Sequence, residues 1–228
     1  MKFSEELKLE NEDIFTLIKN HPFVEGIGKG ILSVDAVRHY VQADYAYLNG
    51  FMKTIGSAIG NANHRNDIAY FSALMQFSLH DEIQAHLCFC EYINVNYEDL
   101  QGQPLPPTGD HYVKHMMYHA QTGTTGEAIS ALLPCPWTYY EIGKYLNETW
   151  QVSDNHPFQI WIQCYANTKQ DVEEMCERLD EHARHASEKE KASMKIAFRK
   201  SCQLEYLFWE MAMSTEEWPS LKEDINNE

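Results

Sequence analysis

Residues 33–59 read SVDAVRHYVQADYAYLNGFMKTIGSAI, and this stretch decides the fold class. Ser33 suits the N-cap of a helix, because its hydroxyl can accept a hydrogen bond from a backbone amide of the first turn. The apolar residues that follow recur at the spacing of one helical face: Val37, Tyr40, Val41, Tyr47, Leu48 and Phe51. The stretch is therefore predicted to form one long helix with a buried side.

Helical spacing continues along most of the chain, whereas the alternation that marks β-strands is almost absent. An all-α fold is therefore predicted. Further helices are expected at residues 4–19, from 21 onward, and at 67–93, 111–120 (capped by Thr108 or Asp110), 127–133, 137–146, 156–167, 169–186 and 188–213. No repeat or long linker divides the sequence, so residues 1–228 are expected to form a single domain, with a frayed acidic tail after about residue 218.

The charge of the chain argues against two classes of partner. Thirty-four acidic and 18 basic residues give a net charge of −16, which repels nucleic-acid phosphates and anionic lipid. The N-terminal sequence MKFSEELKLENED lacks the apolar core of a signal peptide, and the six cysteines contain no C-x-x-C pair. We therefore expect a cytoplasmic protein with reduced thiols, which binds neither nucleic acid nor membrane.

One short segment, LPCPWTYYE at residues 133–141, places a cysteine between two prolines. Pro136 suits the first turn of a helix, and a thiol near a helix N-terminus has a lowered pKa because the free amides and the helix dipole stabilise thiolate. Tyr139 follows Cys135 by one turn and so shares its face. A buried, inert cysteine at a kinked junction explains the same pattern, and on this segment alone it is the simpler interpretation.

Two carboxylates lie at or beside apolar helix faces. Asp44 shares a face with Tyr47, and spacing does not decide whether it is buried or lies at the edge of the stripe. Glu205 borders the apolar face of the last predicted helix. Burial there would raise its pKa, as a general acid or base requires, although a solvated glutamate is the simpler interpretation of the pattern alone.

Histidines one turn apart raise a different possibility, a metal-dependent oxidase. His111, His115 and His119 recur every four residues, and Glu82 precedes His86 by one turn. The Glu-x-x-His spacing of di-iron helical bundles is absent, however. Histidines that form hydrogen bonds or face solvent are therefore the preferred interpretation.

Five separated segments combine into a more specific pattern that resembles the TenA family, also called thiaminase II or aminopyrimidine aminohydrolase. The likeness runs from about residue 3 to residue 218, in the order and at the intervals of the family. The segments are HPFV at 21–24, YVQADYAYL at 40–48, GDHYVKHM at 109–116, PCPWTY at 134–139 and EYLFWEMA at 205–212, in which the matching pattern is Glu205-x-x-Phe208-Trp209-x-Met211-Ala212.

This resemblance implies an all-α fold like that of haem oxygenase, without haem, in a homotetramer. The implied reaction hydrolyses 4-amino-5-aminomethyl-2-methylpyrimidine to the hydroxymethylpyrimidine and ammonia, or thiamin to hydroxymethylpyrimidine and thiazole, within thiamin salvage. No metal and no organic cofactor are expected. The resemblance leaves open which of the two substrates is physiological. A non-enzymatic regulatory protein is a further alternative, although the net charge argues against direct contact with DNA.

The resemblance also implies a role for each site residue. Cys135 matches the nucleophile of the cysteine-type branch, Glu205 the acid that handles protons, and Asp44 the carboxylate that pairs with the aminopyrimidine edge. Tyr112 and Tyr165 match hydroxyls near the reacting centre. The walls of the substrate pocket are matched by Tyr47, Tyr139 and Phe208. Trp137 stands where the family more often has Tyr. Roles for His80, Asp81 and Glu82 stay open.

Overall fold

The computed structural model of the chain describes residues 1–80, 83–150 and 152–219, and these residues contain helices and no strand. The all-α prediction is confirmed. The elements are α1 (Phe3–Glu10), α2 (Glu12–Lys19), α3 (Pro22–Lys29), α4 (Val34–Asn61), α5 (Arg65–His80), α6 (Ile83–Ile93), the 3-10 helix η1 (Tyr97–Leu100), α7 (Pro107–Thr122), α8 (Thr125–Leu132), α9 (Pro134–Trp150), α10 (Gln159–Ala166), α11 (Lys169–His185) and α12 (Glu188–Ser214).

Helix α4 forms as its sequence predicts. The Ser33 hydroxyl accepts a hydrogen bond from the backbone amide of Ala36, and the helix then continues to Asn61. Its apolar face is buried against α5, α6, α7 and α12. Because α4 packs against several other helices, it fixes the side chains of its buried face, Asp44 among them, in the interior of the protein.

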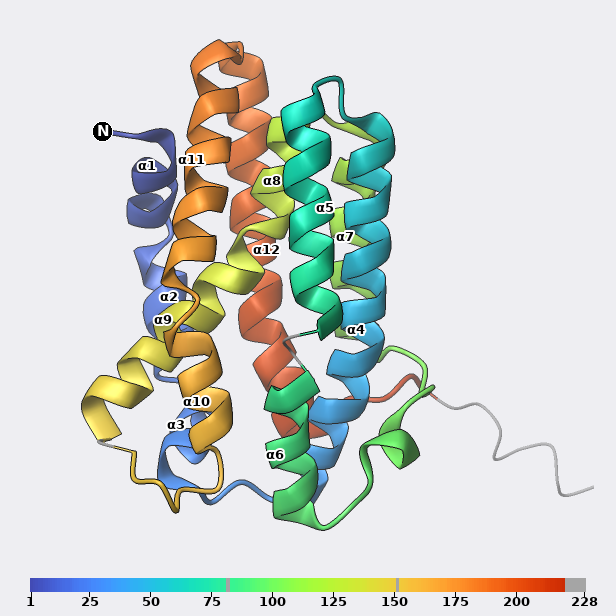
Figure 1. Cartoon of the computed structure of the whole chain (residues 1–228), viewed down its shortest axis with the longest axis vertical. Helices are drawn as coiled ribbons and strands as arrows, with labels where there is room; N and C mark the ends of the chain where they lie inside the picture. Colours follow the sequence, from blue (N-terminus) through green and yellow to red (C-terminus); the bar gives the residue numbers. More distant parts are fainter. Residues whose placement is uncertain (81–82, 151, 220–228) are drawn as a thin grey trace, which may run out of the picture.

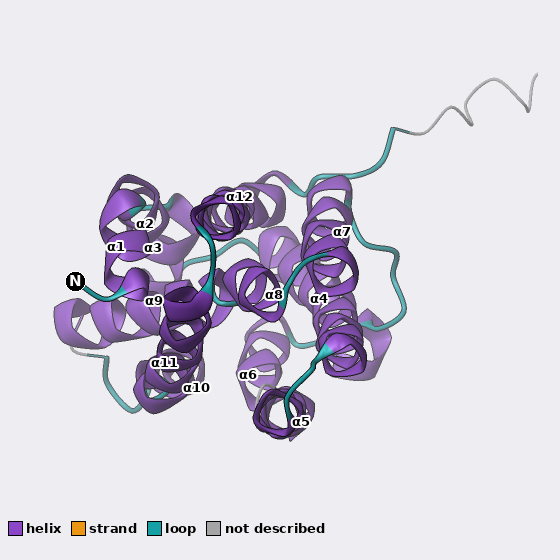
Figure 2. Cartoon of the chain, turned by 90° about the horizontal axis from the view of Figure 1, so that it is seen from above, coloured by secondary structure: helices purple, strands orange, loops and turns teal. Residues whose placement is uncertain are grey.

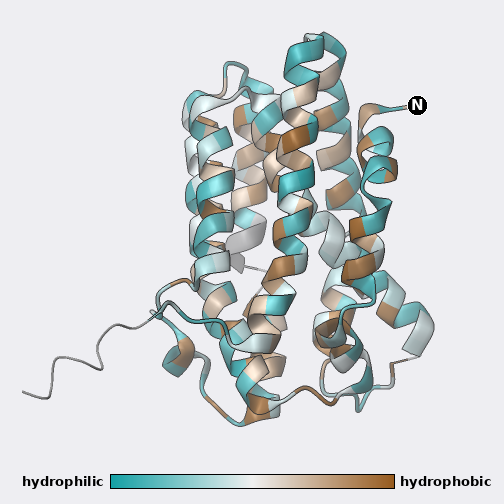
Figure 3. Ribbon diagram, turned by 180° about the vertical axis from the view of Figure 1, so that it is seen from behind, coloured by the Kyte–Doolittle hydropathy of each residue, from teal (hydrophilic) through white to brown (hydrophobic). Residues whose placement is uncertain are grey.

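The long helices α4, α5, α7, α11 and α12 run side by side, and α9 crosses them obliquely (Figure 1). Seen from above, α1–α3 lie together on one side of the bundle, beside α9 and α12 (Figure 2). Hydrophobic and hydrophilic residues are mixed along the individual helices, as expected when each buries one face (Figure 3). Among the described residues, no helix has the length and apolar character needed to cross a bilayer.

Three predicted boundaries differ from the structure. Residues 4–19 form two helices, because the buried Asn11 side chain binds the Leu7 carbonyl and accepts a hydrogen bond from Arg199 of α12. The predicted helix 67–93 is described as α5 and α6, and Asp81, Glu82 and the acidic tail after Pro219 lie outside the described residues.

The third difference concerns the start of α7, which begins at Pro107, with Pro106 as its N-cap. Thr108 and Asp110 were expected as caps, but both lie inside the first turn. Thr108 instead binds Glu216, through its amide at 2.9 Å and its hydroxyl at 3.2 Å. Proline suits the first helical turn because its missing N–H would have no partner there.

Candidate active site

A cavity of about 130 Å³ opens between the helices and gathers residues that are far apart in the sequence. Its lining comes from five helices: Asp44, Tyr47, Leu48 and Phe51 of α4; Tyr70, Ala73 and Leu74 of α5; Cys135, Pro136 and Tyr139 of α9; Tyr165 of α10; and Asp171, Glu174 and Met175 of α11, together with Thr168. Asp44, Tyr47, Cys135, Tyr139 and Tyr165 are therefore brought together here.

Cys135 lies in the first turn of α9. Helix α8 ends at Leu132, and Leu133 alone separates it from α9. Helix α9 begins at Pro134, two residues earlier than Pro136 suggested. The position near a helix N-terminus is thus confirmed, and the half-buried thiol borders the cavity. The thiol also interacts with the Tyr47 hydroxyl, whose pKa is raised by burial and further by the negative charge that Cys135 would carry. A thiol in this place is available to a ligand.

Glu205 is 2% exposed on α12 and accepts a hydrogen bond of 3.0 Å from the Thr138 hydroxyl, one turn after Cys135. The helical pattern alone favoured a solvated side chain; the structure buries it. The pKa of Glu205 is raised to about 7, mainly by burial and in small part by the charge on Asp44, while hydrogen bonds from Tyr112 and Thr138 oppose the rise. A carboxyl with this pKa exchanges protons readily near neutral pH, which suits an acid–base role.

Asp44 is 3% exposed and forms a 2.7 Å hydrogen bond through Oδ2 with Nε2 of His86. The other ring nitrogen of His86 lies 2.9 Å from the Tyr97 hydroxyl. Sequence reasoning considered His86 only as a possible metal ligand and missed this pair. A signal was present, since His86 is the one imidazole in the largely apolar segment Ile83–Ile93, and an imidazole buried in such a segment needs polar partners.

The predicted aromatic residues occupy two positions relative to the cavity. Tyr139 and Tyr165 line it with their rings 4.7 Å apart, edge to face. Tyr112 and Phe208 are not part of the lining and pack against Tyr47, with ring centroids at 5.1 Å and 5.3 Å. These two residues therefore support the wall rather than form it.

Tyr112 carries a buried hydroxyl that makes no hydrogen bond of normal geometry to a described residue. Glu205 and Tyr47 are nevertheless its polar neighbours, because both influence its ionisation. Burial raises the pKa of Tyr112 well above its usual value, and the negative charge of Glu205 adds to the rise. The phenol is thus a neutral donor beside the acid.

Trp137 is not part of the cavity lining. Its ring contacts Phe15 and Phe198 edge to face, at 5.9 Å and 6.0 Å. Trp137 therefore takes part in the packing of α9 against α2 and α12.

The histidines considered for a metal centre form other contacts. His115 binds the Ala197 carbonyl at 3.1 Å, and burial lowers its pKa to about 4. His86 is bound to Asp44 and Tyr97, and Glu82 lies outside the described residues. Across residues 1–80, 83–150 and 152–219, no three His, Cys, Asp or Glu side chains are grouped so that they could hold a metal ion.

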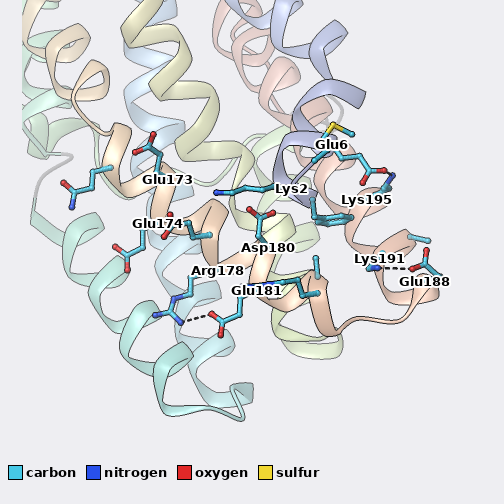
Figure 4. A pocket seen from close by; sticks show the side chains of 17 residues that line it. Lys2, Glu6, Glu173, Glu174, Arg178, Asp180, Glu181, Glu188, Lys191 and Lys195 are labelled. Atoms are coloured by element: carbon cyan, nitrogen blue, oxygen red, sulfur yellow. Dashed lines mark hydrogen bonds and ion pairs between the residues drawn. The ribbon is translucent and has the colours of Figure 1, made fainter.

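A larger groove of about 1420 Å³ runs between the N-terminal residues, α11 and α12 (Figure 4). Its charged side chains pair with one another at the surface, as Arg178 does with Glu181 and Lys191 with Glu188. Surface pairs of this kind contribute little to stability, and none of the predicted site residues lines this groove. The smaller cavity is therefore the candidate active site.

Comparison with known proteins places this geometry in a family. Residues 10–215 match the TENA/THI-4/PQQC family. Among curated relatives, the aminopyrimidine aminohydrolase of Bacillus subtilis (strain 168) is 34% identical over 96% of this chain and 92% of its own length. The aminopyrimidine aminohydrolase of Halalkalibacterium halodurans is 33% identical over 96% and 98% of the two chains.

Solved structures show the same fold. The TenA homologue from P. horikoshii OT3 superposes with a TM-score of 0.80 at 22% identity, covering 94% of this chain and 99% of its own. A Shewanella denitrificans domain of unknown function with a heme oxygenase-like fold superposes with a TM-score of 0.66 at 13% identity, covering 92% and 90%. The haem-oxygenase-like architecture is confirmed, and the chain belongs to the TENA/THI-4/PQQC family.

Proposed function

We propose that this protein is an aminopyrimidine aminohydrolase of thiamin salvage. It converts 4-amino-5-aminomethyl-2-methylpyrimidine and water to the hydroxymethylpyrimidine and ammonia, and it cleaves thiamin to hydroxymethylpyrimidine and thiazole. The observation that carries the proposal is that the thiol of Cys135 and the carboxylate of Asp44 line one cavity. The relatives from Bacillus subtilis and Halalkalibacterium halodurans, which are named aminopyrimidine aminohydrolases, support it.

The size of the cavity agrees with a single heteroaromatic ring. A cavity of about 150 Å³ in another protein holds benzene, and the cavity here measures about 130 Å³. Tyr139 and Tyr165 supply aromatic walls, and Asp44 supplies an acceptor for an amino group on the ring edge. A flat amine is thus the ligand class that the lining favours.

The chemistry begins with the ring, because its aromaticity resists loss of a group from the side-chain methylene. The Cys135 thiolate adds to a ring carbon while Glu205 gives a proton to ring nitrogen. The electron-rich adduct then expels ammonia from the protonated aminomethyl group, which leaves an exocyclic methylene. Water adds to that methylene and gives its second proton to the released ammonia, the carbon–sulfur bond breaks, and the ring proton returns to Glu205. Aromaticity is restored and the thiolate is regenerated.

Glu205 is suited to this exchange, because a carboxyl with a pKa of about 7 can give and take a proton at similar cost. Glu205 accepts a hydrogen bond from Thr138, which lies in the same turn of α9 as Cys135. The homotetramer that the family resemblance implies and the cytoplasmic location expected from the N-terminal sequence belong to the same proposal. Light scattering of the purified protein tests the assembly.

The direct test incubates the purified chain with the aminomethylpyrimidine, and separately with thiamin. Ammonia and hydroxymethylpyrimidine should appear in equal amounts from the first, and hydroxymethylpyrimidine and thiazole from the second. Cys135→Ala is the inactive control. Absence of turnover on both substrates would overturn the proposal, and turnover of another compound that depends on added iron or manganese would favour the oxidase alternative.

A further inference from the structure

His86 uses both of its ring nitrogens, although the mechanism above gives it no task. The ring is 1% exposed on α6, with Nε2 2.7 Å from Oδ2 of Asp44 and Nδ1 2.9 Å from the Tyr97 hydroxyl. The Tyr40 ring meets it edge to face at 6.4 Å. Because rotation of the imidazole would break both hydrogen bonds, its orientation is fixed.

The contact with Asp44 determines where the proton lies. An ionised carboxylate can only accept hydrogen bonds, so Nε2 of His86 must carry a proton. In the neutral ring, Nδ1 then accepts a hydrogen bond from the Tyr97 hydroxyl. Tyr97 thereby favours the tautomer that donates to Asp44.

The second oxygen of Asp44 is left for a ligand. Asp44 lines the cavity, and within the described part of the chain its hydrogen bonding is limited to the contact of Oδ2 with His86. An acceptor on the cavity wall can take a hydrogen bond from a donor on a bound molecule. The amino group of a heteroaromatic amine is such a donor.

We propose that His86 is a positioning residue: it holds Oδ2 of Asp44 so that Oδ1 meets the ring amino group of the substrate. This inference rests on the proposed function, since it concerns how that substrate is aligned. Misplacing a binding group by about 1 Å can cost about 100-fold in rate, which gives the orienting bond its importance.

Two substitutions separate the hydrogen bond from the bulk of the ring. His86→Gln can place an amide donor near the position of Nε2, whereas His86→Leu fills similar space without a donor. We expect kcat/KM to fall about 10- to 100-fold in His86→Leu, mainly through KM because the amino group is bound before and during the reaction. His86→Gln should keep most of the activity.

The chain supplies a matched control in a second Asp–His pair. His182 of α11 binds Asp67 of α5 at 3.1 Å, and neither residue lines the cavity. His182→Leu should therefore lower the melting temperature without changing KM. An equal rise in KM in His182→Leu and His86→Leu would show a general structural effect and overturn the proposal.

A double-mutant cycle tests whether His86 acts through Asp44. In the Asp44→Ala background, His86→Leu should change kcat/KM, or the Kd for hydroxymethylpyrimidine, by less than about threefold, because the orienting bond no longer has its partner. A further loss as large as in the wild-type background would contradict the inference.

The tautomer of His86 gives a readout that does not depend on turnover. Nitrogen-15 NMR of the ligand-free protein should show the proton on Nε2, and Asp44→Asn should shift that signal while His182→Leu does not. A ring with its only proton on Nδ1 would overturn the inference even if the enzyme is active. An inactive wild-type protein with the expected tautomer would instead reject the proposed function alone.

Discussion

The Thr138 hydroxyl donates a 3.0 Å hydrogen bond to Oε2 of Glu205 and lies 3.3 Å from the carbonyl of Cys135. Thr138 is 1% exposed, so this link is shielded from water. The acid on α12 is therefore tied to the turn of α9 that carries the thiol. Two residues separated by 70 positions in the sequence are connected by one hydroxyl.

Removing this hydroxyl should change the acidity of Glu205. The Thr138 hydrogen bond lowers the pKa of the carboxyl, so Thr138→Val should raise it above its value of about 7. If turnover needs protonated Glu205, the alkaline limb of the plot of kcat/KM against pH moves to higher pH. Thr138→Ser, which keeps the hydroxyl, should leave the limb in place. Identical profiles for all three proteins would show that this bond does not control the acid.

Glu205 should also make the fold less stable at high pH. Its carboxyl is protonated below about pH 4.5 in both the folded and the unfolded chain, and above about pH 7 it is ionised in both. Between these values the folded state binds more protons, so the stability that Glu205 contributes is lost as pH rises. Moving the pKa from 4.5 to about 7 corresponds to roughly 3 kcal/mol.

Glu205→Gln should therefore raise the free energy of unfolding by about 1 to 3 kcal/mol at pH 8, and far less at pH 4.5. Urea titrations of both proteins at the two pH values measure the difference. A gain that is the same at both pH values would point to packing, and not to the charge of Glu205. The same variant should lose turnover, since an amide cannot supply the proton.

Replacing the nucleophile should remove the chemistry and leave binding. Cys135→Ser lowers kcat by at least about 10³-fold in our expectation, because a hydroxyl ionises far less readily than a thiol. The Kd for hydroxymethylpyrimidine, measured by calorimetry, should stay within about threefold of wild type. Cys176→Ser is the control, since Cys176 does not line the cavity. Near-normal turnover in Cys135→Ser would rule out the covalent route.

A close contact between α9 and α10 should be needed for both stability and activity. A Cβ atom at Gly143 would lie 2.5 Å from the backbone nitrogen of Ala166 and 2.8 Å from the carbonyl carbon of Tyr165. Gly143→Ala must therefore push α10 outward, together with Tyr165. We expect a loss of about 1 to 3 kcal/mol in unfolding free energy and a lower kcat/KM.

Gly56 of α4 provides the comparison for this substitution. A Cβ atom there meets only the end of Met75, at 3.7 Å. Gly56→Ala should be neutral, or stabilise the helix by up to about 1 kcal/mol, because alanine favours helix over glycine. Thermal melts of the two variants and the wild type measure the difference. An equal loss of stability in Gly56→Ala and Gly143→Ala would contradict this account.

The sequence predicted most of the helices because their causes are local. The Ser33 cap and the spacing of Val37, Tyr40 and Val41 all lie within α4, and the structure reproduces them. The break at Asn11 has a distant cause, because Arg199 on α12 binds the same side chain. No local pattern could indicate that contact.

The candidate site also combines features that have local causes with features that depend on distant contacts. Cys135 stands near a helix start because of its own prolines, which the sequence shows. The burial of Glu205 depends on which helices cover it, and spacing alone pointed to solvent. Asp44 and His86 meet only because α4 packs against α6. The resemblance to a family supplied the order of these residues, and their roles in the reaction stay predictions.

The order in which the chain is made gives the Thr138–Glu205 link a further consequence. A ribosome releases Asp44 and Cys135 well before α12, the last helix, which carries Glu205. Until that helix docks, the nascent chain holds the thiol without the acid. A chain that stops short of residue 188 would thus have the nucleophile but no group in the place of Glu205, and we expect that it could not turn over substrate.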